Sequence, residues 1–271
     1  MANRSICANT CSTDAKTKME TLTGLRDGLE SWCQGSTYPI FLQKFVPIWL
    51  NILSAPPVFI STSPEQKIRN CVLEIIHRLP MNPVDATEPH CAAIVDKCLE
   101  LIRTENEDNA VICLKIVMDF ERAHVKALGG RAQKFLDLIL ELFDSMQQTV
   151  HDTFDSAQAK DASSQDAAFA NSPRPGSPVA TTTTVIGADP GTEPQTTRQL
   201  VKGMQSFKVV AECPIIVVSI FQAHRTLAPD NVAKFTPRIK AALQLEAGPQ
   251  KAAHEEAQAN GTIFTLSLIH I

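Results

Sequence analysis

The chain has 271 residues, of which 44% are hydrophobic and 20% are charged, and its formal net charge is −4. These values are typical of a globular protein of one or two domains, and the small negative charge gives no reason to expect nucleic-acid binding. Residues 1–18 are polar, so no signal peptide is expected. The most apolar run, 213–223, is closed by charged residues and is much shorter than the roughly twenty residues of a membrane span, so no transmembrane helix is expected.

The eight cysteines form no dense framework of the kind that disulfide-rich domains show. Cys71, Cys98 and Cys113 fall on the apolar faces of expected helices. This placement favours reduced core thiols over disulfides and suits a cytosolic or nuclear protein.

Most of the chain is expected to be helical. Residues 1–13 are expected to be loose, and beyond them apolar residues recur at three- and four-residue steps, the period of an amphipathic helix. Ser63 and Pro64 open one helix with a capping serine and a proline at the first helical position. The other expected helices cover 14–33, 38–53, a stretch from Thr87 or Glu88 to Arg103, 105–128, 131–150, a stretch around 200–221 and 229–243.

Three prolines, Pro47, Pro214 and Pro237, fall inside these helices and should kink or interrupt them. The β-branched run 215–218 could also form a strand, but its helical surroundings favour a buried helix. In the last helix the residues expected to face inward are Val232, Phe235, Ile239 and Leu243.

The segment 105–150 is the clearest unit of the chain. Two apolar stripes lie on either side of Gly129-Gly130, which predicts two helices joined by a tight turn in an antiparallel hairpin. Because one hairpin cannot cover its own apolar face, it needs neighbours of the same kind. Such hairpins recur about every 40 to 50 residues, the spacing of HEAT-like repeats.

The composition changes between residues 152 and 197, where Ala, Ser, Thr, Pro and Asp dominate. This stretch cannot bury enough apolar surface to offset its ordering entropy, so it is expected to be a disordered insertion. The predicted organisation is therefore an all-α, HEAT-like α-solenoid with repeats at 14–151 and 198–265, separated by this insertion.

No residue pattern predicts catalysis, a cofactor or a metal. Cys7 and Cys11 lie in a polar tail without a second pair, and His90, Cys91 and Cys98 lack a fourth ligand at a recognised spacing. No phosphate-binding glycine loop and no nucleophile motif is present. The sequence therefore predicts a protein that is not an enzyme and binds no small-molecule substrate.

A few polar residues have alternative interpretations. His77 and His124 are expected to be surface or interhelical hydrogen-bonding groups rather than bases. The acidic run Glu105, Glu107 and Asp108 complements the N-terminal dipole of a helix, or else contacts a basic partner. The basic residues Lys126, Arg131 and Lys134 near the Gly-Gly turn are a solvated cluster, or else contact an acidic peptide.

Four stretches of the chain resemble one known family. They are 63–80 (SPEQKIRNCVLEIIHRLP), 105–119 (ENEDNAVICLKIVMD), 206–218 (SFKVVAECPIIVV) and the Phe-Thr-Pro at 235–237. They are similar, in the same order and with the same low-complexity break, to the extreme N-terminus of the TRRAP-type transcription-associated proteins, and the break is most similar to that of fungal members. The resemblance covers residues from about 22 to about 253.

The resemblance implies a segment of a giant phosphatidylinositol-3-kinase-related protein whose kinase domain is inactive. Such proteins are nuclear scaffolds of SAGA-type and related histone acetyltransferase complexes, and transcription activators contact them. The expected partners are thus coactivator-complex subunits and activators, with no membrane, cofactor or direct nucleic-acid contact. No site residue carries over, because the kinase region is not in this chain.

The last six residues, 266–271, read LSLIHI, which is the translation of a transposon end used in sequencing libraries. We therefore expect a non-native tail on a truncated gene product.

The alternative to the function that the resemblance implies is that of a free-standing α-helical adaptor of another pathway.

Overall fold

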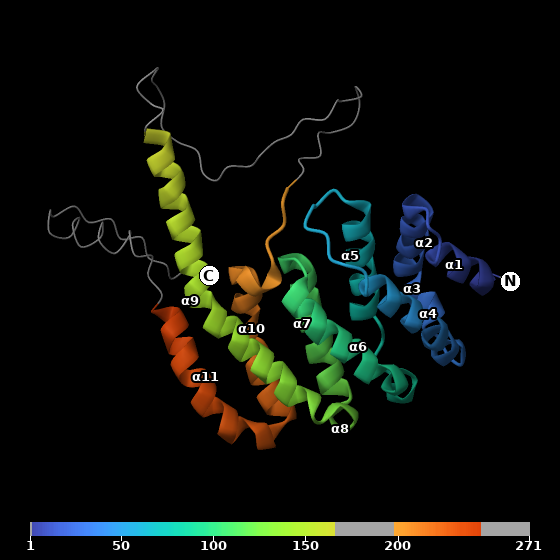
Figure 1. The fold of residues 1–271 in the computed structure, drawn as a ribbon. Coiled ribbons are helices and arrows are strands. Elements are labelled where there is room, and N and C mark those ends of the chain that lie inside the picture. The colour runs from blue at the N-terminus through green and yellow to red at the C-terminus, as the bar shows by residue number, and fades with distance from the viewer. Residues whose placement is uncertain (1, 166–197, 245–271) are drawn as a thin grey trace.

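The computed structural model describes residues 2–165 and 198–244, and every regular element in these ranges is helical (Figure 1). Its eleven α-helices and two short 3₁₀ helices are α1 (Ala2–Thr10), α2 (Ala15–Asp27), α3 (Leu29–Trp32), α4 (Thr37–Leu53), α5 (Pro64–His77), α6 (Val84–Thr104), α7 (Glu107–Ala123), α8 (Val125–Leu128), α9 (Arg131–Gln165), η1 (Gly203–Gln205), α10 (Phe207–Ala223), η2 (Arg225–Leu227) and α11 (Ala228–Leu243).

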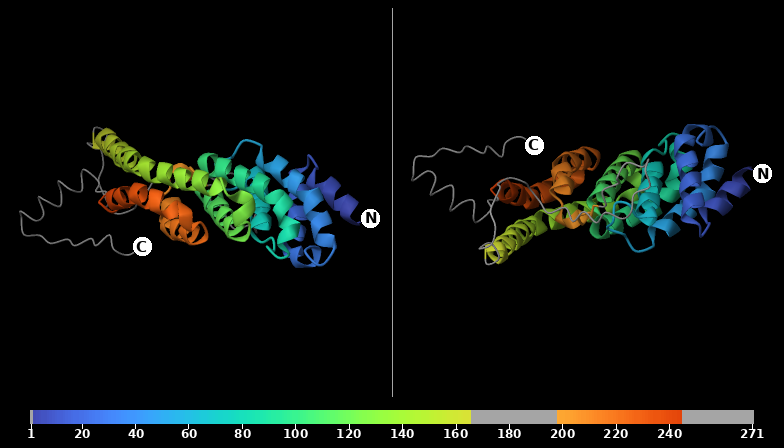
Figure 2. Two further views of the ribbon diagram at one scale, coloured as in Figure 1. Left: turned by 90° about the horizontal axis from the view of Figure 1, so that it is seen from below. Right: turned by 90° about the horizontal axis from the view of Figure 1, so that it is seen from above.

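The longer helices form two layers. Helices α2, α5, α7 and α10 pack in succession in one layer, and α4, α6, α9 and α11 pack in succession in the other. Two further views show the elongated body that results, with the N-terminal helices at one end and α11 at the other (Figure 2). The predicted all-α solenoid is therefore confirmed.

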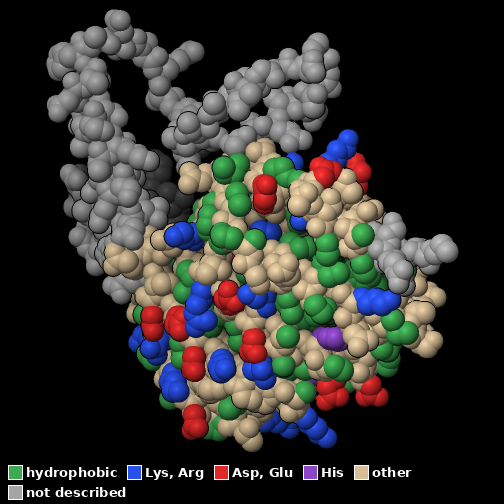
Figure 3. Space-filling model, turned by 45° about the vertical axis from the view of Figure 1, so that its right-hand side comes forward, with side chains coloured by type: hydrophobic (Ala, Val, Ile, Leu, Met, Phe, Trp, Pro, Cys, Tyr) green, Lys and Arg blue, Asp and Glu red, His purple; other side chains and the backbone are tan. Residues whose placement is uncertain are grey.

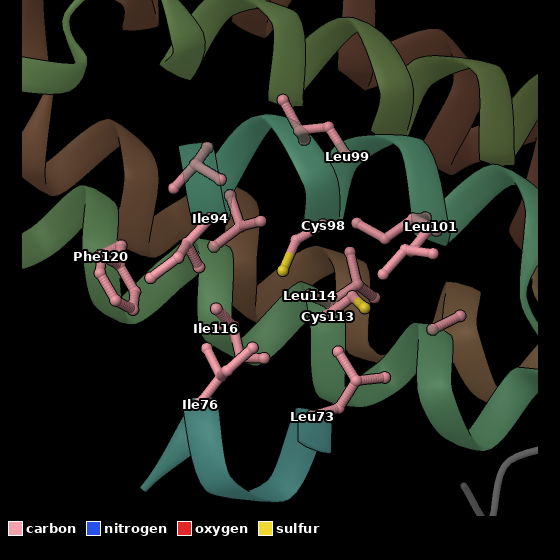
Figure 4. Packing of buried hydrophobic residues seen from close by; sticks show 14 of the residues in the cluster. Leu73, Ile76, Ile94, Cys98, Leu99, Leu101, Cys113, Leu114, Ile116 and Phe120 are labelled. Carbon is pink, nitrogen blue, oxygen red and sulfur yellow. The ribbon is translucent and has the colours of Figure 1, made fainter. Parts of the chain in front are cut away.

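The core lies between the two layers and follows the apolar stripes of the sequence. Leu114 and Phe120 of α7 are fully buried, and Figure 4 shows them among side chains from α5 and α6. Burial of such a side chain stabilises the fold by about 1.5–3 kcal/mol. The cysteines expected in the core, Cys71, Cys98 and Cys113, are buried free thiols.

The expected segment bounds need several corrections. Residues 1–13 were expected to be loose, but Ala2–Thr10 is helix α1, in which Ile6 and Cys7 pack against the core and Thr10 is buried. The expected helix 14–33 is divided at Gly28 into α2 and α3.

Helix α9 also continues past residue 152, where the insertion was expected to begin, and ends at Gln165. The rest of the predicted insertion, 166–197, lies outside the described residues, as does everything after 244, including the predicted tail at 266–271.

The three interior prolines do not end their helices. Pro47 lies inside α4, Pro214 inside α10 and Pro237 inside α11, and each helix is continuous. A proline removes one backbone hydrogen bond, but the turns on both sides of Pro47 are fixed by the buried rings of Phe45 and Trp49. Tertiary packing thus overrides the local cost.

The two halves of segment 105–150 pack mainly on other helices. Helix α7 lies against α5, α6 and α10, whereas α9 lies against α10 and α11, and the short α8 joins them. The predicted hairpin therefore needs correction: α9 does not pack back on α7, and the helix that pairs most closely with α7 is α6 of the other layer. In α11, Phe235 is buried as expected, but Val232 and Leu243 are exposed by 47% and 83%.

Candidate functional site: the outer face of the α2–α5–α7–α10 layer

A buried polar junction ties the loops of three repeats together. Arg69 of α5 is 2% exposed, and its Nε donates to Glu105 Oε1 at 2.7 Å. Its guanidinium also donates to the carbonyls of Ala55 at 2.7 Å and of Ile52 and Leu53 at 3.2 Å, at the C-terminus of α4. This arrangement satisfies both a buried cation and the orphan carbonyls of a helix end.

Glu105 is fully buried and accepts further hydrogen bonds. Its Oε2 accepts from the amides of Asn106 at 3.2 Å and Asn109 at 3.0 Å. The Asn106 side chain in turn caps α7, accepting from the backbone N–H of Asn109. The carboxylate therefore has a cation and two amides, which is what keeps a buried charge stable.

Residues 198–206, which comprise a stretch without regular structure and then η1, run across this junction and are called the strap here. Its backbone forms isolated β-bridges to Ile60 in the α4–α5 loop and to Asn106 in the α6–α7 turn. The Gly203 N–H donates to the Glu105 carbonyl at 2.7 Å. A Cβ added to Gly203 would lie 2.6 Å from the Cβ of Ala110, so this close approach requires glycine.

The acidic run of the sequence is used inside the chain. Glu105 pairs with Arg69, Glu107 accepts a hydrogen bond from Ser206 at 2.7 Å, and Asp108 pairs with Lys208. Glu107 and Asp108 lie in the first turn of α7, where they complement the helix dipole. The structure therefore favours the first interpretation of this run over a contact to a basic partner.

The three basic residues near the Gly-Gly turn have different surroundings. Arg131 forms a double hydrogen bond with Asp96 at 2.9 and 2.7 Å, while Lys126 and Lys134 are exposed. On the face of the molecule in Figure 3, acidic and basic side chains are interspersed over the lower left, and hydrophobic ones gather at the upper centre and right.

An open groove of about 490 Å³ lies between α7 and α10, with α5 at its side. We call it the α7–α10 groove. Its apolar part contains Met118 of α7 and Ile215 and Val218 of α10. Ile215 is 66% exposed and Val218 is 54% exposed, unusually open positions for β-branched side chains. The other lining residues are His77, Lys115, Asp119, Arg122, Glu212, Ile216, Ser219 and Gln222.

The charged rim of the α7–α10 groove contains two loose pairs and one free cation. His77 Nε2 lies 3.6 Å from Asp119 Oδ2, and Lys115 Nζ lies 3.9 Å from Glu212 Oε1. Arg122 is exposed, and the described residues offer it neither an ion pair nor a hydrogen bond. Exposed pairs at these distances contribute little to stability, so their charges are available to a partner.

A second hollow lies further along the same layer. It has a volume of about 320 Å³ and includes Arg26 of α2, Asn70 of α5, Asp108 of α7 and Leu200 of the strap. In α7, Asp108 lines this hollow and Lys115, Asp119 and Arg122 line the groove, at helical spacing on one side of the helix. Both hollows therefore open on one continuous face.

The buried histidines hold helices to one another. His124 Nε2 lies 2.8 Å from Thr87 Oγ1 of α6, and His224 Nε2 lies 3.0 Å from Glu121 Oε2 of α7. Burial raises the pKa of Glu121 to about 7, although Arg131 opposes this, and burial lowers the pKa of His224. Both directions favour an uncharged pair, as a nonpolar environment demands.

Burial also makes the core thiols poor nucleophiles. It raises the pKa of Cys71 to about 11 and that of Cys213 to about 12. Within residues 2–165 and 198–244, no group of three or more His, Cys, Asp or Glu side chains has the geometry of a metal site.

The same ranges contain no single helix long and apolar enough to cross a membrane. Phe207–Ala223 and Arg225–Leu243 reach the required length only together, and the pair is bent by 112°.

Sequence reasoning did not identify the groove residues. One signal was available in the four consecutive β-branched residues of α10 at 215–218. Four consecutive residues go once around a helix, so they cannot all face its buried side. Ile216 and Val217 point inward, and Ile215 and Val218 are left exposed.

The fold and its face describe a class of protein: an all-α solenoid segment with a hollowed outer surface. The particular relatives are transcription-associated proteins. The chain is 27% identical over 248 residues, 90% of its length, to the "Transformation/transcription domain-associated protein" of Homo sapiens. It is 27% identical over 264 residues, 92% of its length, to the "SAGA complex/NuA4 acetyltransferase complex subunit TRA1" of Saccharomyces cerevisiae.

A third relative, the "Probable transcription-associated protein 1" of Dictyostelium discoideum, is 34% identical over 135 residues, which is 50% of this chain and 3% of that protein. No protein-family model matches the chain. The chain spans about 6–7% of the length of the human and yeast relatives. The predicted resemblance to a segment of a TRRAP-type protein is confirmed.

Proposed function

We propose that this chain is a non-catalytic scaffold segment of a transcription coactivator, working in the nucleus within a SAGA-type or related histone acetyltransferase complex. The observation that carries the proposal is the similarity over nine-tenths of the chain to proteins named as subunits of such complexes. The solenoid supports it, because stacked helical hairpins expose long surfaces to protein partners.

The partners in this proposal are other subunits of the complex and transcription activators. The outer face of the α2–α5–α7–α10 layer is the surface for them, since it combines two hollows with exposed apolar side chains and loosely paired charges. Its mixed charges suit protein contacts better than a phosphate backbone, which needs a concentrated positive surface.

An affinity tag on the endogenous gene product tests the proposal. Purification from nuclear extract should recover acetyltransferase subunits in stoichiometric amounts together with histone acetyltransferase activity. Crosslinking mass spectrometry on the intact assembly should then place crosslinks from Lys67, Lys115 or Lys208, which lie on or beside the hollowed face, to other subunits. A product that purifies without acetyltransferase subunits would instead support a free-standing helical adaptor.

A further inference from the structure

We propose that the α7–α10 groove docks one amphipathic helix of a partner protein. The apolar side chains of that helix would pack on Met118, Ile215 and Val218, and one of its carboxylates would pair with Arg122. The inference rests on the proposed scaffold role and adds to it a binding site and the chemistry of its ligand.

The shape of the groove fits a helix. Its lining residues in α10 extend from Glu212 to Gln222, which at 1.5 Å per residue is about 15 Å, or roughly three helical turns. A helix laid along α10 would present apolar residues at steps of three or four over that length. The exposed sides of Ile215 and Val218 are the surface that such residues would cover.

The charges select the kind of helix. Asp119 and Glu212 each lie beside a basic group, His77 and Lys115, so these two loose pairs favour neither sign of ligand charge. Arg122 lines the same groove and has no partner among the described residues. A carboxylate on the ligand would complete that pair, and removal of water by the apolar contacts beside it would strengthen the attraction.

A further helical repeat stacked on α10 and α11 would not occupy this groove. Such a repeat would lie on the side of α10 away from α7, whereas Lys115, Met118 and Arg122 of α7 and His77 of α5 form the other half of the lining. The groove opens on the outer face of the layer, where a helix of a partner protein can reach it.

Two labelled peptides test the inference against the purified 271-residue chain. Both are designed helices of about 16 residues with leucines at i, i+4 and i+7, and they differ only in carrying Glu or Lys at the position that meets Arg122. We expect fluorescence anisotropy to show saturable binding of the Glu peptide and at least about tenfold weaker binding of the Lys peptide.

The variants separate charge from apolar contact. Arg122→Glu should reverse the preference between the two peptides, and its charge-matched control, Lys134→Glu on the exposed side of α9, should leave it unchanged. The pair Ile215→Ser and Val218→Ser should weaken both peptides at least about tenfold. The control Val232→Ser, at an exposed apolar residue of α11 outside the groove, should weaken neither. All these side chains are exposed, so thermal unfolding should stay unchanged.

The inference is overturned if neither peptide binds saturably at up to about 1 mM, if Arg122→Glu leaves the preference as it was, or if Val232→Ser weakens binding as much as the groove pair does. Co-purification with acetyltransferase subunits would be unaffected by these results. Failure of the groove and failure of the proposed function are therefore separate outcomes.

Discussion

Two sets of ion pairs lie on the same layer of helices and have opposite surroundings. The Arg69–Glu105 pair is 2% and 0% exposed, and both side chains carry further hydrogen bonds. At the α7–α10 groove, Lys115 and Glu212 are 40% and 36% exposed and lie 3.9 Å apart. The difference in burial gives the two pairs different roles. The buried Arg69–Glu105 pair holds loops together, and the exposed Lys115–Glu212 pair leaves its charges accessible to a ligand.

The largest expected effect comes from a buried charge that has no partner at all. Leu114→Asp places a carboxylate in the α5–α6–α7 core, where nothing like Arg69 can pair with it. We expect loss of the cooperative thermal transition by circular dichroism, because the cost exceeds about 5 kcal/mol. Gln222→Asp, at an exposed position of α10, should retain the transition. A stable Leu114→Asp protein would refute the assignment of this face of α7.

Breaking the buried pair should be the next most harmful change. Arg69→Met leaves Glu105 charged and buried, so chemical denaturation should show a loss of about 3–5 kcal/mol. Lys115→Met at the groove should cost at most about 1 kcal/mol.

The double variant Arg69→Met with Glu105→Met sharpens the comparison. Removal of both charges should recover part of the loss, since no unpaired charge remains. If Arg69→Met and Lys115→Met cost the same, burial does not distinguish the two pairs.

The buried Glu121–His224 pair gives a pH-dependent prediction. The pKa of Glu121 is raised from 4.5 to about 7 by burial, so the folded chain holds this proton more tightly and loses stability as pH rises through that window. Glu121→Gln removes the titration and keeps a hydrogen-bonding group, while His224 stays in both proteins.

The free energy of unfolding of Glu121→Gln, relative to the parent chain, should therefore rise between pH 4.5 and 7 by up to about 3 kcal/mol and then level off. A difference that does not change across this window would show that Glu121 is ionised in the fold at pH 5.

A smaller effect is expected where the strap crosses the junction. Gly203→Ala would place its Cβ against Ala110 and should cost about 1–3 kcal/mol by overpacking. Gly130→Ala is the matched control, because a Cβ there meets nothing within 4 Å. Equal thermal midpoints for the two variants would mean that the strap moves aside without cost.

Local signals in the sequence predicted much of the helical fold. The start of α5 follows from Ser63, whose Oγ accepts from the N–H of Gln66, and from Pro64 at the first helical position. The apolar period identified the buried sides of α7 and α9. The predicted interruption at Pro237 was wrong, and α4 and α10 also continue past Pro47 and Pro214, because local geometry cannot show how much buried surface holds both sides of a proline.

The candidate site could not be predicted from local signals, because the residues that pair in it are far apart in the sequence. Arg69 and Glu105 are 36 residues apart, and Lys115 meets Glu212 across the insertion. The exposure of Ile215 depends on which side of α10 receives a neighbour, which is a property of stacking rather than of the run 215–218 itself.

The strap has a consequence for how this solenoid unfolds. In repeat proteins each unit contacts its immediate neighbours, so an end can fray while the rest persists. Here the strap is paired to Phe59 and Ser61, two repeats back, and to Glu105 and Glu107. Helices α10 and α11 follow the strap in the chain, so they can detach first, but the strap before them stays paired to loops of earlier repeats. Under a pulling force applied at residue 244, α11 and α10 should therefore open first, and the release of the strap should free the loops at 59–61 and 105–107 together in one later step.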